Sequence, residues 1–594
     1  MHEFRIWGPL AKRIQLRCGQ QTCAMQGPGE MGWWKLEVSD AHSGMDYAFL
    51  IDDDPTPYPD PRSMWQPQGV HGPSRLYDQG TFAWSDAHWQ PSPLFGAVLY
   101  EMHIGTFSES GTFDGAIAHL DHLVELGVTH IEVMPIADFA GDRGWGYDGV
   151  ALFAVSESYG GPEAFKRFVD ACHAKGLAVI LDVVYNHFGP VGNYTNKFGP
   201  YLTDSYNTLW GAAVNFSDAG SDEVRRFFCD NAEMWLRDYH VDGLRLDAVH
   251  AMVDRSAVNF LEQLSAEVER LGTTLGRKLV LIAESDLNDP RLVRPREANG
   301  YGIDAQWSDD LHHALFTLLY FTPERRAEAR AGTDISYYAD FGTMDDLVKA
   351  LTEVFVYDGR YSLFRKHRHG RPVKALAAQR FVVFAQNHDQ IGNRARGERL
   401  EHLAGMDAAK VALGLVLMAP FIPLLFMGEE FAASTPFLYF ANHEDPEMMK
   451  RVTEGRKREF AAFGFGGDEI PDPEQISSFQ DSKLQWSEVH EGLHAEMLAW
   501  TKDLIHLRRS TLALNDGDLG HLKVEFDREQ RWLAMQRGPV RVLVNLGGHS
   551  VDFAAKPGEQ LRLCSRELAL RDGVLQLPAI SLAVLTSGAT DRSV

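Results

Sequence analysis

The stretch Gly243-Leu244-Arg245-Leu246-Asp247 is a short apolar run that ends in a carboxylate, and it follows a segment with helical spacing. In that segment Val224, Phe228, Trp235 and Tyr239 fall on one face of a predicted helix. An amphipathic helix that leads into a short buried strand is the repeating unit of parallel sheets. The stretch therefore predicts a helix packed against a parallel strand that ends at Asp247.

The same alternation of short apolar runs with amphipathic segments begins near Ala97 and continues through the middle of the chain. Eight of the apolar runs are predicted to be strands. They are residues 98–100, 130–134, 178–182, 243–247, 279–284, 303–307, 381–384 and 423–426. Eight strands that alternate with helices predict an α/β fold, a closed (β/α)8 barrel.

The two ends of the chain follow a different pattern, in which polar and apolar residues alternate over short runs. Arg13-Ile14-Gln15-Leu16-Arg17 is one example, and Val540-Arg541-Val542-Leu543-Val544 is another. Such alternation is typical of antiparallel strands. We predict an N-terminal β-sandwich and connector over residues 1–92, the catalytic barrel with insertions over 93–511, and a C-terminal β-sandwich domain over 512–594.

The overall charge is acidic, since 82 Asp and Glu residues face 57 Lys and Arg residues, for a formal charge of −25. This balance disfavours nucleic acid and anionic membranes as partners and suits a neutral ligand. No apolar run is long enough to span a bilayer, and the first residues do not form a secretory signal. Cys18 and Cys23 could pair across a hairpin, but five scattered cysteines favour free thiols. We predict a cytoplasmic protein.

Polar residues follow several predicted strands, and the carboxyl ends of barrel strands open onto one face. They are Asp182 and His187 after the third strand, Arg245 and Asp247 on the fourth, Glu284 on the fifth, and Asn387, His388 and Asp389 after the seventh. A buried carboxylate costs several kcal/mol unless it is paired or used. An ion pair that holds the barrel mouth explains Asp182 and Arg245 equally well, whereas Asp247 and Glu284 on adjacent strands favour catalysis.

Two carboxyl groups about 5 to 5.5 Å apart suit a retaining glycosidase, in which one attacks the anomeric carbon and the other protonates the leaving oxygen. Arg245 lies two residues before Asp247 and is expected to keep that carboxylate ionised. The apolar run before Glu284 is expected to raise the pKa of its carboxyl. Asp247 is therefore the predicted nucleophile and Glu284 the predicted acid/base.

Further polar residues at the strand ends are candidates for contact with the sugar. Asp389 is predicted to stabilise an oxocarbenium-like transition state, with His187 and His388 donating hydrogen bonds to the same ring. Tyr147 lies on a glycine-flanked loop after the second strand. It could form the floor of a sugar subsite or, nearly as well, anchor its own loop.

Metal and nucleotide chemistry have little support in the sequence. His312 and His313 are adjacent but have no accompanying His-x-x-x-His pair or cysteine cluster. A calcium site formed by Asn186 and loop carbonyls is conceivable, and no glycine-rich phosphate loop is present. We therefore predict neither a metal centre nor a cofactor.

Four segments together resemble the signature regions of the α-amylase family, in the family's order. They are Asp182-Val183-Val184-Tyr185-Asn186-His187, Gly243-Leu244-Arg245-Leu246-Asp247, Ala283-Glu284 and Asn387-His388-Asp389. The resemblance implies a barrel fold and α-glucan chemistry. It also implies that the nucleophile, the acid/base and the transition-state stabiliser are Asp247, Glu284 and Asp389.

A finer resemblance, over nearly the whole chain, is to the maltooligosyltrehalose trehalohydrolases within that family. It rests on Tyr100-Glu101-Met102-His103-Ile104-Gly105-Thr106-Phe107, Phe426-Met427-Gly428-Glu429-Glu430, Phe440-Ala441-Asn442-His443-Glu444-Asp445-Pro446, Ser482-Lys483-Leu484-Gln485-Trp486 and Trp307-Ser308-Asp309-Asp310-Leu311-His312-His313. By this resemblance, several residues are expected to contact the terminal trehalose unit or its neighbours. They are His250, Asp309, Asp310 and His312, together with Gln390 and Asn393 just past Asp389.

One difference from many α-amylases supports the finer resemblance. Where those enzymes carry Lys-His shortly after the nucleophile, this chain has His250-Ala251. The implied reaction is hydrolysis of the α-1,4 bond next to the terminal trehalose of maltooligosyltrehalose, which releases trehalose and a maltooligosaccharide. A maltooligosyltrehalose synthase that makes the substrate is implied as a functional partner.

Two other functions remain open at this point. A 1,4-α-glucan branching enzyme shares the fold and the three carboxylates, but passes the glycosyl group to a sugar hydroxyl instead of to water. A non-catalytic glucan-binding protein on the same barrel would be expected to lack at least one of the carboxylates, and all three are present here.

Overall fold

The computed structural model describes residues 1–208, 211–321, 337–461, 469–568 and 570–587. At its centre, eight parallel strands close into a barrel in chain order, and the last strand pairs with the first. The strands are β7 (Leu99–Met102), β8 (His130–Val133), β11 (Ala178–Val183), β14 (Gly243–Leu246), β15 (Val280–Ala283), β16 (Ala305–Trp307), β19 (Phe381–Phe384) and β20 (Ile422–Phe426). All eight predicted strands are confirmed, and the predicted barrel with them.

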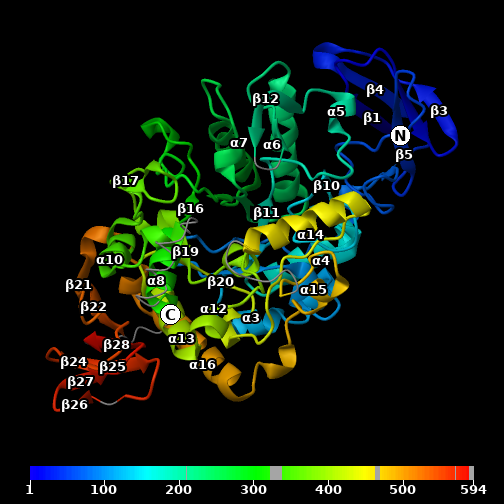
Figure 1. Ribbon diagram of the computed structural model, residues 1–594. Helices are drawn as coiled ribbons and strands as arrows, with labels where there is room; N and C mark the ends of the chain where they lie inside the picture. The colour runs from blue at the N-terminus through cyan, green and yellow to red at the C-terminus, as the bar shows by residue number, and fades with distance from the viewer. Residues whose placement is uncertain (209–210, 322–336, 462–468, 569, 588–594) are drawn as a thin grey trace.

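Helices cover the outside of the barrel (Figure 1). The longer ones are α4 (Gly161–Ala174), α6 (Ser221–Asp238), α7 (Phe260–Leu275), α8 (Asp310–Tyr320), α10 (Met344–Glu353), α13 (Met406–Met418) and α16 (Gly492–Ser510). A further long helix, α14 (Pro446–Ala461), contacts the end of α11 (His388–Gly392) and the segment just after it through Arg456. The predicted helix before the fourth strand is α6, and its side chains Val224, Phe228 and Trp235 are buried. Between β15 and β16 the chain forms only a short 3-10 turn, η5 (Arg296–Ala298), which directly follows Pro295.

The barrel interior is apolar in one layer and charged in the next. Leu99, Ile180, Ile282 and Phe384 come from alternate strands, and they pack together with Leu424 of β20 in one buried cluster. The charged layer lies nearer the carboxyl ends of the strands, and its side chains include Glu101, Glu132, Asp182 and Arg245. A buried charged layer beside an apolar one marks this end of the barrel as the place to look for chemistry.

The N-terminal β domain contains two small sheets, as the alternating pattern predicted. One pairs β1 (His2–Trp7) with β4 (Trp33–Val38), and the other has the order β3-β2-β5-β6. The strands of the second sheet are β2 (Ile14–Cys18), β3 (Gln21–Ala24), β5 (Asp46–Ile51) and β6 (Ser74–Arg75). Phe4, Trp34 and Phe49 are buried in the core of this domain.

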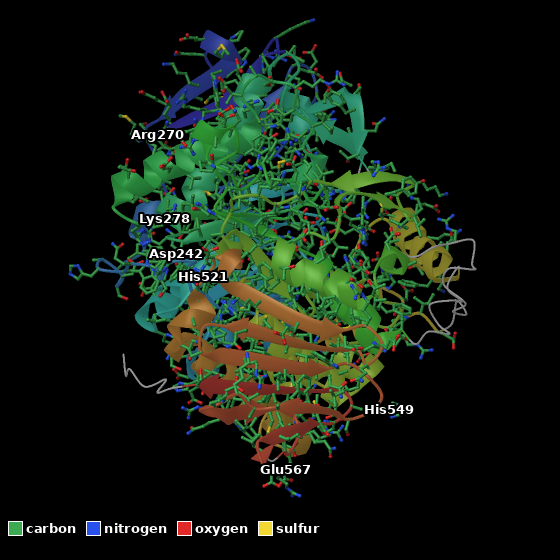
Figure 2. The ribbon with its side chains drawn as sticks, turned by 90° about the vertical axis from the view of Figure 1, so that its left-hand side faces the viewer. Asp242, Arg270, Lys278, His521, His549 and Glu567 are labelled. Carbon is green, nitrogen blue, oxygen red and sulfur yellow. The ribbon has the colours of Figure 1, made fainter. Side chains whose placement is uncertain are left out.

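The C-terminal β domain lies at the opposite end of the molecule from the N-terminal one (Figures 1 and 2). Its five-stranded sheet has the order β21-β22-β23-β28-β25, and a three-stranded sheet has the order β24-β27-β26. The strands are β21 (Leu522–Asp527), β22 (Trp532–Arg537), β23 (Val540–Asn545), β24 (Val551–Ala554), β25 (Glu559–Cys564), β26 (Leu570–Arg571), β27 (Val574–Leu577) and β28 (Ser581–Ser587). Leu543, Leu575 and Leu585 pack between the two sheets.

A buried histidine ties the connector after the N-terminal domain to the barrel. His173 of α4 contacts Asp86 of the connector through Nδ1 at 2.8 Å and Asp242, just before β14, through Nε2 at 3.0 Å. Trp89 stacks on the histidine ring with centroids 4.4 Å apart and donates to Asp242. The two carboxylates raise the pKa of His173 above its usual value although burial lowers it, so the contact favours the charged imidazolium.

The five cysteines are all free thiols, so Cys18 and Cys23 do not form the disulfide that their spacing would permit. In the part of the chain that the structure describes, no helix is both long and apolar enough to cross a membrane.

Candidate active site

Arg245 stands at the centre of the charged layer and is fully buried. Its Nη1 donates to both oxygens of Asp182, at 3.1 and 2.9 Å, and to Oδ1 of Asp247 at 2.7 Å. Nη2 lies 3.8 Å from Oε2 of Glu284, and the guanidinium packs over the face of Trp307. One buried cation therefore faces three carboxyl groups from three neighbouring strands.

Asp247 directly follows β14, and both of its carboxylate oxygens have partners. Arg245 holds Oδ1, and Nδ2 of Asn186 donates to Oδ2 at 2.8 Å. Oδ1 of Asn186 in turn contacts Nδ1 of His187 at 2.5 Å, which fixes the amide orientation. Both oxygens of Asp247 therefore act as hydrogen-bond acceptors, one of them from a cation.

The residue after Asp247 has an unusual backbone conformation that brings the next strand end into register. Ala248 has φ of 40° and ψ of 49°, in the left-handed region that an L-residue enters at a cost of about 1 kcal/mol or more. In this conformation its N–H donates to Oε2 of Glu284 at 2.6 Å. The turn therefore fixes the carboxyl of Glu284 beside that of Asp247.

Glu284 directly follows β15, and 17% of its side chain is exposed. Burial raises the pKa of Glu284 to about 8; Arg245 opposes the shift, and the negative charges of Asp247, Asp389 and Asp309 add to it. Because Oε2 accepts the hydrogen bond from Ala248, the proton of the neutral acid belongs on Oε1. At neutral pH Glu284 is thus a proton donor beside an ionised carboxylate.

Asp389 lies in the first turn of α11 (His388–Gly392), and 45% of its side chain is exposed. The side chain of Asn387 caps this turn by accepting hydrogen bonds from the N–H groups of Asp389 and Gln390. Oδ1 of Asp389 accepts from Nδ2 of Asn393 at 3.2 Å, and Oδ2 lies 3.5 Å from Nε2 of His388. The cap holds the most exposed of the three candidate carboxylates in place at the barrel mouth.

Tyr147 and His388 form a stacked pair that joins two sides of the site. Their rings lie 5.2 Å apart at an interplanar angle of 21°, and the hydroxyl of Tyr147 contacts Nε2 of His388 at 2.9 Å. The same hydroxyl donates to Oδ2 of Asp182 at 2.7 Å. Asp182 is itself 3% exposed, and burial raises its pKa to about 7 despite the opposing charge of Arg245.

His250 marks another side of the site. It lies in the turn η4 (Val249–Ala251), where its Nδ1 accepts from the N–H of Asp286 at 3.3 Å, and burial lowers the pKa of its ring. Asp286 is also held by the hairpin of β17 (Asp358–Ser362) and β18 (His367–Gly370): Arg365 forms an ion pair with its carboxylate, and Nε2 of His369 donates to its carbonyl at 2.7 Å. The loops after Asp247 and Glu284 and the hairpin therefore form one connected wall.

This wall exposes large apolar side chains. They are Leu287 at 48%, Tyr361 at 54%, Leu363 at 49% and Phe364 at 46% exposure. Apolar and aromatic faces that stay exposed beside a polar site are suited to packing against the C–H faces of sugar rings.

Asp309 and its neighbours divide into two groups. Asp309 lies beside the site: its Oδ1 accepts from Nε2 of Gln390 at 3.1 Å, and burial together with the charges of Asp389 and Asp286 raises its pKa to about 7. Asp310 instead points toward the hairpin base, where its Oδ2 accepts from Asn288 and from the N–H groups of residues 356 and 357.

His312 also differs from the expected direct sugar contact. It is 1% exposed, its Nδ1 lies 2.5 Å from the carbonyl of Ala385, and its Nε2 lies 2.9 Å from the hydroxyl of Tyr338. Both ring nitrogens are therefore engaged within the protein. Successive residues of a helix turn by about 100°, so Asp310 leaves the face that Asp309 occupies. His312 returns close to that face, but its ring is buried and contacts Ala385 and Tyr338. We interpret both as residues that support the site from behind.

Three residues of the site had no assigned role in the sequence analysis. Glu101 at the end of β7 contacts His388, Asn186 contacts Asp247, and Arg365 contacts Asp286. Glu101 did carry a signal, since it is a charged residue in an apolar strand. Arg365 carried none, because its hairpin lies outside the barrel repeat.

Within the described ranges, no group of three or more His, Cys, Asp or Glu side chains is arranged to hold a metal ion. Asn186, the amide considered for calcium, donates to both the carbonyl and the carboxylate of Asp247.

The fold and the carboxylates at its mouth define a glycoside hydrolase of the α-amylase class. The model of the alpha amylase catalytic domain matches residues 81–208. A malto-oligosyltrehalose trehalohydrolase from Rhizobium sp. (strain M-11) is 46% identical over 590 residues, covering 98% of this chain and 97% of its own. The chain belongs to the malto-oligosyltrehalose trehalohydrolase family.

Two further comparisons agree with this assignment. A solved structure from Salmonella typhimurium described as an alpha amylase has a TM-score of 0.88 at 36% identity and covers 98% of this chain and 97% of its own. A 1,4-alpha-glucan branching enzyme from Bacillus caldolyticus is more distant, at 28% identity over 72% of this chain and 64% of its own.

Proposed function

We propose that this protein is a retaining glycoside hydrolase that cleaves the α-1,4 bond next to the terminal trehalose of maltooligosyltrehalose. Its products are trehalose and a shortened maltooligosaccharide. The observation that carries the chemistry is the pair formed on adjacent strands by Asp247, whose two oxygens both accept hydrogen bonds, and Glu284, whose pKa is raised by burial. Family membership carries the choice of substrate.

In the first step Asp247 attacks the anomeric carbon of the glucosyl unit next to the trehalose. The bond from that carbon to O4 of the trehalose breaks, and Glu284 gives its proton to O4, so trehalose leaves as a neutral alcohol. A covalent ester links the maltooligosyl group to Asp247, and Glu284 is left as a carboxylate. The charge of Arg245 beside both groups compensates the carboxylate that has lost its proton.

In the second step Glu284 takes a proton from water, and the resulting hydroxide attacks the same anomeric carbon. The ester bond to Asp247 breaks, and the maltooligosaccharide leaves with the α-configuration that it had in the substrate. Both carboxyl groups return to their starting protonation states. Two displacements at one carbon therefore account for retention.

The remaining polar residues are proposed to hold the reacting sugar. Asp389 is the most exposed of the three carboxylates and is placed to stabilise positive charge on the ring in the transition state. Tyr147, His187 and His388 lie around the same mouth, and Gln390 and Asn393 orient Asp309 and Asp389. Arg245 is a positioning residue, because its guanidinium is buried behind the carboxylates.

The wall of His250, Asp286 and the β17–β18 hairpin is proposed to face the leaving trehalose. It continues the loops that follow Asp247 and Glu284, and it carries exposed apolar side chains that include Tyr361 and Phe364. A non-reducing disaccharide presents two glucose rings with an α,α-1,1 linkage. The wall would then select trehalose over the maltose unit at the end of a linear glucan, because maltose would leave some polar groups of the wall without hydrogen-bond partners.

A product assay tests this function directly. Purified protein incubated with maltooligosyltrehalose is expected to release trehalose, and proton NMR of the first turnover products is expected to show the α-anomer of the new reducing end. Amylose is the comparison substrate. New α-1,6 branches on amylose without trehalose release would instead establish a branching enzyme, and binding without turnover would establish a non-catalytic glucan-binding protein.

Two further proposals follow from the family. The substrate has a trehalose end, so a maltooligosyltrehalose synthase must act before this enzyme. A cytoplasmic location, where maltodextrins would be available to both enzymes, stays a prediction.

A further inference from the structure

Glu101 is a buried carboxylate for which the proposed reaction has no use. It lies on β7, and it is 1% exposed. Both of its oxygens contact one residue: Oε2 accepts from the backbone N–H of His388 at 3.1 Å, and Oε1 lies 2.5 Å from Nδ1 of the same residue. Burial of a carboxylate costs several kcal/mol of desolvation free energy. Because both oxygens of Glu101 contact His388 at the barrel mouth, we asked what this contact does for His388.

The hydrogen bonds of the neighbouring residues determine which protons His388 carries. When Asp182 is the carboxylate that accepts from Arg245, Tyr147 donates its one hydroxyl proton to Asp182 as well. The contact at 2.9 Å between the Tyr147 hydroxyl and Nε2 of His388 must then use a proton from His388. Nδ1 faces the carboxylate of Glu101 and so carries a proton as well. A histidine with protons on both ring nitrogens is an imidazolium.

We propose that Glu101 is a positioning residue that holds His388 as an imidazolium, whose Nε2–H donates to the Tyr147 hydroxyl and whose positive charge lies beside Asp389 and the sugar. Glu101 does not touch the substrate itself and acts through His388. The inference rests on the proposed function in one respect, because it assigns His388 to the sugar-binding side of the site.

The electrostatics around His388 agree with this geometry. Burial lowers the pKa of its ring, but Asp389 and Glu101 outweigh burial and raise that pKa to about 9. The charged and titratable groups that act on His388 come from several elements of the barrel. They are Glu101 on β7, Glu132 on β8, Asp182 on β11, Arg245 on β14, His103 before α1 (Ile104–Phe107) and Asp389 on α11.

Replacement of Glu101 by glutamine removes the negative charge of this side chain but keeps nearly the same shape. A carboxylate accepts both hydrogen bonds of His388, whereas an amide has one oxygen and one NH2 group. The amide oxygen can accept from the backbone N–H of His388, but its NH2 group then needs an acceptor at Nδ1. Glu101→Gln therefore favours a neutral His388 with its only proton on Nε2.

Glu132 provides a matched control on the neighbouring strand. It is directly opposite Glu101 in the register of β7 and β8, and it is also 1% exposed. Among the residues that the structure describes, its Oε2 has no hydrogen-bond partner, and burial with the nearby charge of Glu101 raises its pKa well above the usual value. Burial thus favours the neutral acid of Glu132, and no hydrogen bond of the described residues joins it to His388, so Glu132→Gln replaces a buried carboxyl group without removing a contact of His388.

The experiment compares kcat/KM from pH 5 to 9 for the wild type, Glu101→Gln and Glu132→Gln. We expect Glu101→Gln to lose at least about tenfold at pH 7 and to recover toward pH 5, where a neutral His388 gains its second proton. Glu132→Gln should follow the wild-type profile. Parallel profiles for the two glutamine variants, or a loss in Glu101→Gln that does not recover in acid, would overturn the proposal.

A second variant covers the case in which Glu101→Gln does not fold. Glu101→Asp keeps the negative charge but withdraws it by one methylene, so we expect a lower kcat/KM with a profile of wild-type shape. A profile for Glu101→Asp that recovers in acid would contradict the inference. If the proposed substrate is wrong, the wild type will not release trehalose from maltooligosyltrehalose, and this result is independent of the comparison between variants. The same series can then be measured with maltoheptaose, because the ratio between variants carries the test.

Discussion

Activity is predicted to fall on the alkaline side of neutrality because Glu284 must be protonated to release trehalose. Its pKa is about 8, so about nine tenths of the enzyme carries the proton at pH 7 and about one tenth at pH 9. The value of kcat/KM should therefore fall about tenfold between pH 7 and pH 9. The direction of this pH dependence follows from the raised pKa. Glu284 keeps its proton to a higher pH than an ordinary glutamate, so the enzyme stays active to a correspondingly higher pH.

The position of this alkaline limb should respond to the charge of Asp309. That carboxylate is one of the charges that raise the pKa of Glu284, so Asp309→Asn should lower the pKa and move the limb to lower pH by roughly half to one unit. Asp304→Asn is the control. Asp304 lies at the opposite end of the same strand region, where it pairs with Lys278 at 3.0 Å.

The assay is the initial rate of trehalose release at low concentrations of maltooligosyltrehalose, measured at half-unit steps of pH. Unfolding is checked at each pH by circular dichroism. Because the carboxylates interact, the apparent pKa describes Glu284 together with its charged neighbours. A rate that stays constant to pH 9, or a limb that moves equally in Asp309→Asn and Asp304→Asn, would refute the role given to Glu284.

Three further predictions concern other parts of the molecule. Asp247→Asn should lower kcat by at least about a thousandfold, or about 4 kcal/mol, while calorimetry shows retained substrate binding; near-normal turnover would remove Asp247 as nucleophile. Phe364→Ala should raise KM about threefold to tenfold with little change in kcat, whereas Leu512→Ala, at 87% exposure, should leave both unchanged; equal effects would argue against the hairpin wall. The pKa of His173 is raised in the folded protein, so its contribution to the free energy of unfolding is complete below about pH 6.5 and is lost as pH rises through that folded-state pKa. Urea unfolding should show this pH dependence in the wild type but not in His173→Gln.

Much of the fold could be predicted because a parallel barrel has a simple sequence pattern. Each strand is a run of about four apolar residues, and polar residues appear where the run meets the open end. Asp247 and Glu284 could be paired from sequence because their strands are adjacent in the chain and in the barrel. The predicted roles of these residues remain proposals, but their placement at one rim follows from topology alone.

The sequence could not predict contacts between residues that are far apart in the chain or that lie outside the repeating pattern of strands and helices. Glu101 and His388 are 287 residues apart, and they meet because β20 closes the barrel by pairing with both β19, which precedes His388, and β7, which carries Glu101. The pairing of Arg365 with Asp286 depends on a hairpin inserted after α10. Asp309 and Asp310 are neighbours in sequence but face different surroundings, and only the start of α8 decides which of them faces the site.

The buried guanidinium of Arg245 links the two protonation states that a retaining mechanism needs. Its Nη1 already serves Asp182 and Asp247, and its Nη2 is 3.8 Å from Glu284. One cation cannot stabilise three carboxylates in a desolvated site to the same degree. The closer contacts are with Asp182 and Asp247, and the negative charge of Asp247 raises the pKa of Glu284. The same nucleophile that Arg245 holds in place therefore helps to keep the proton donor neutral.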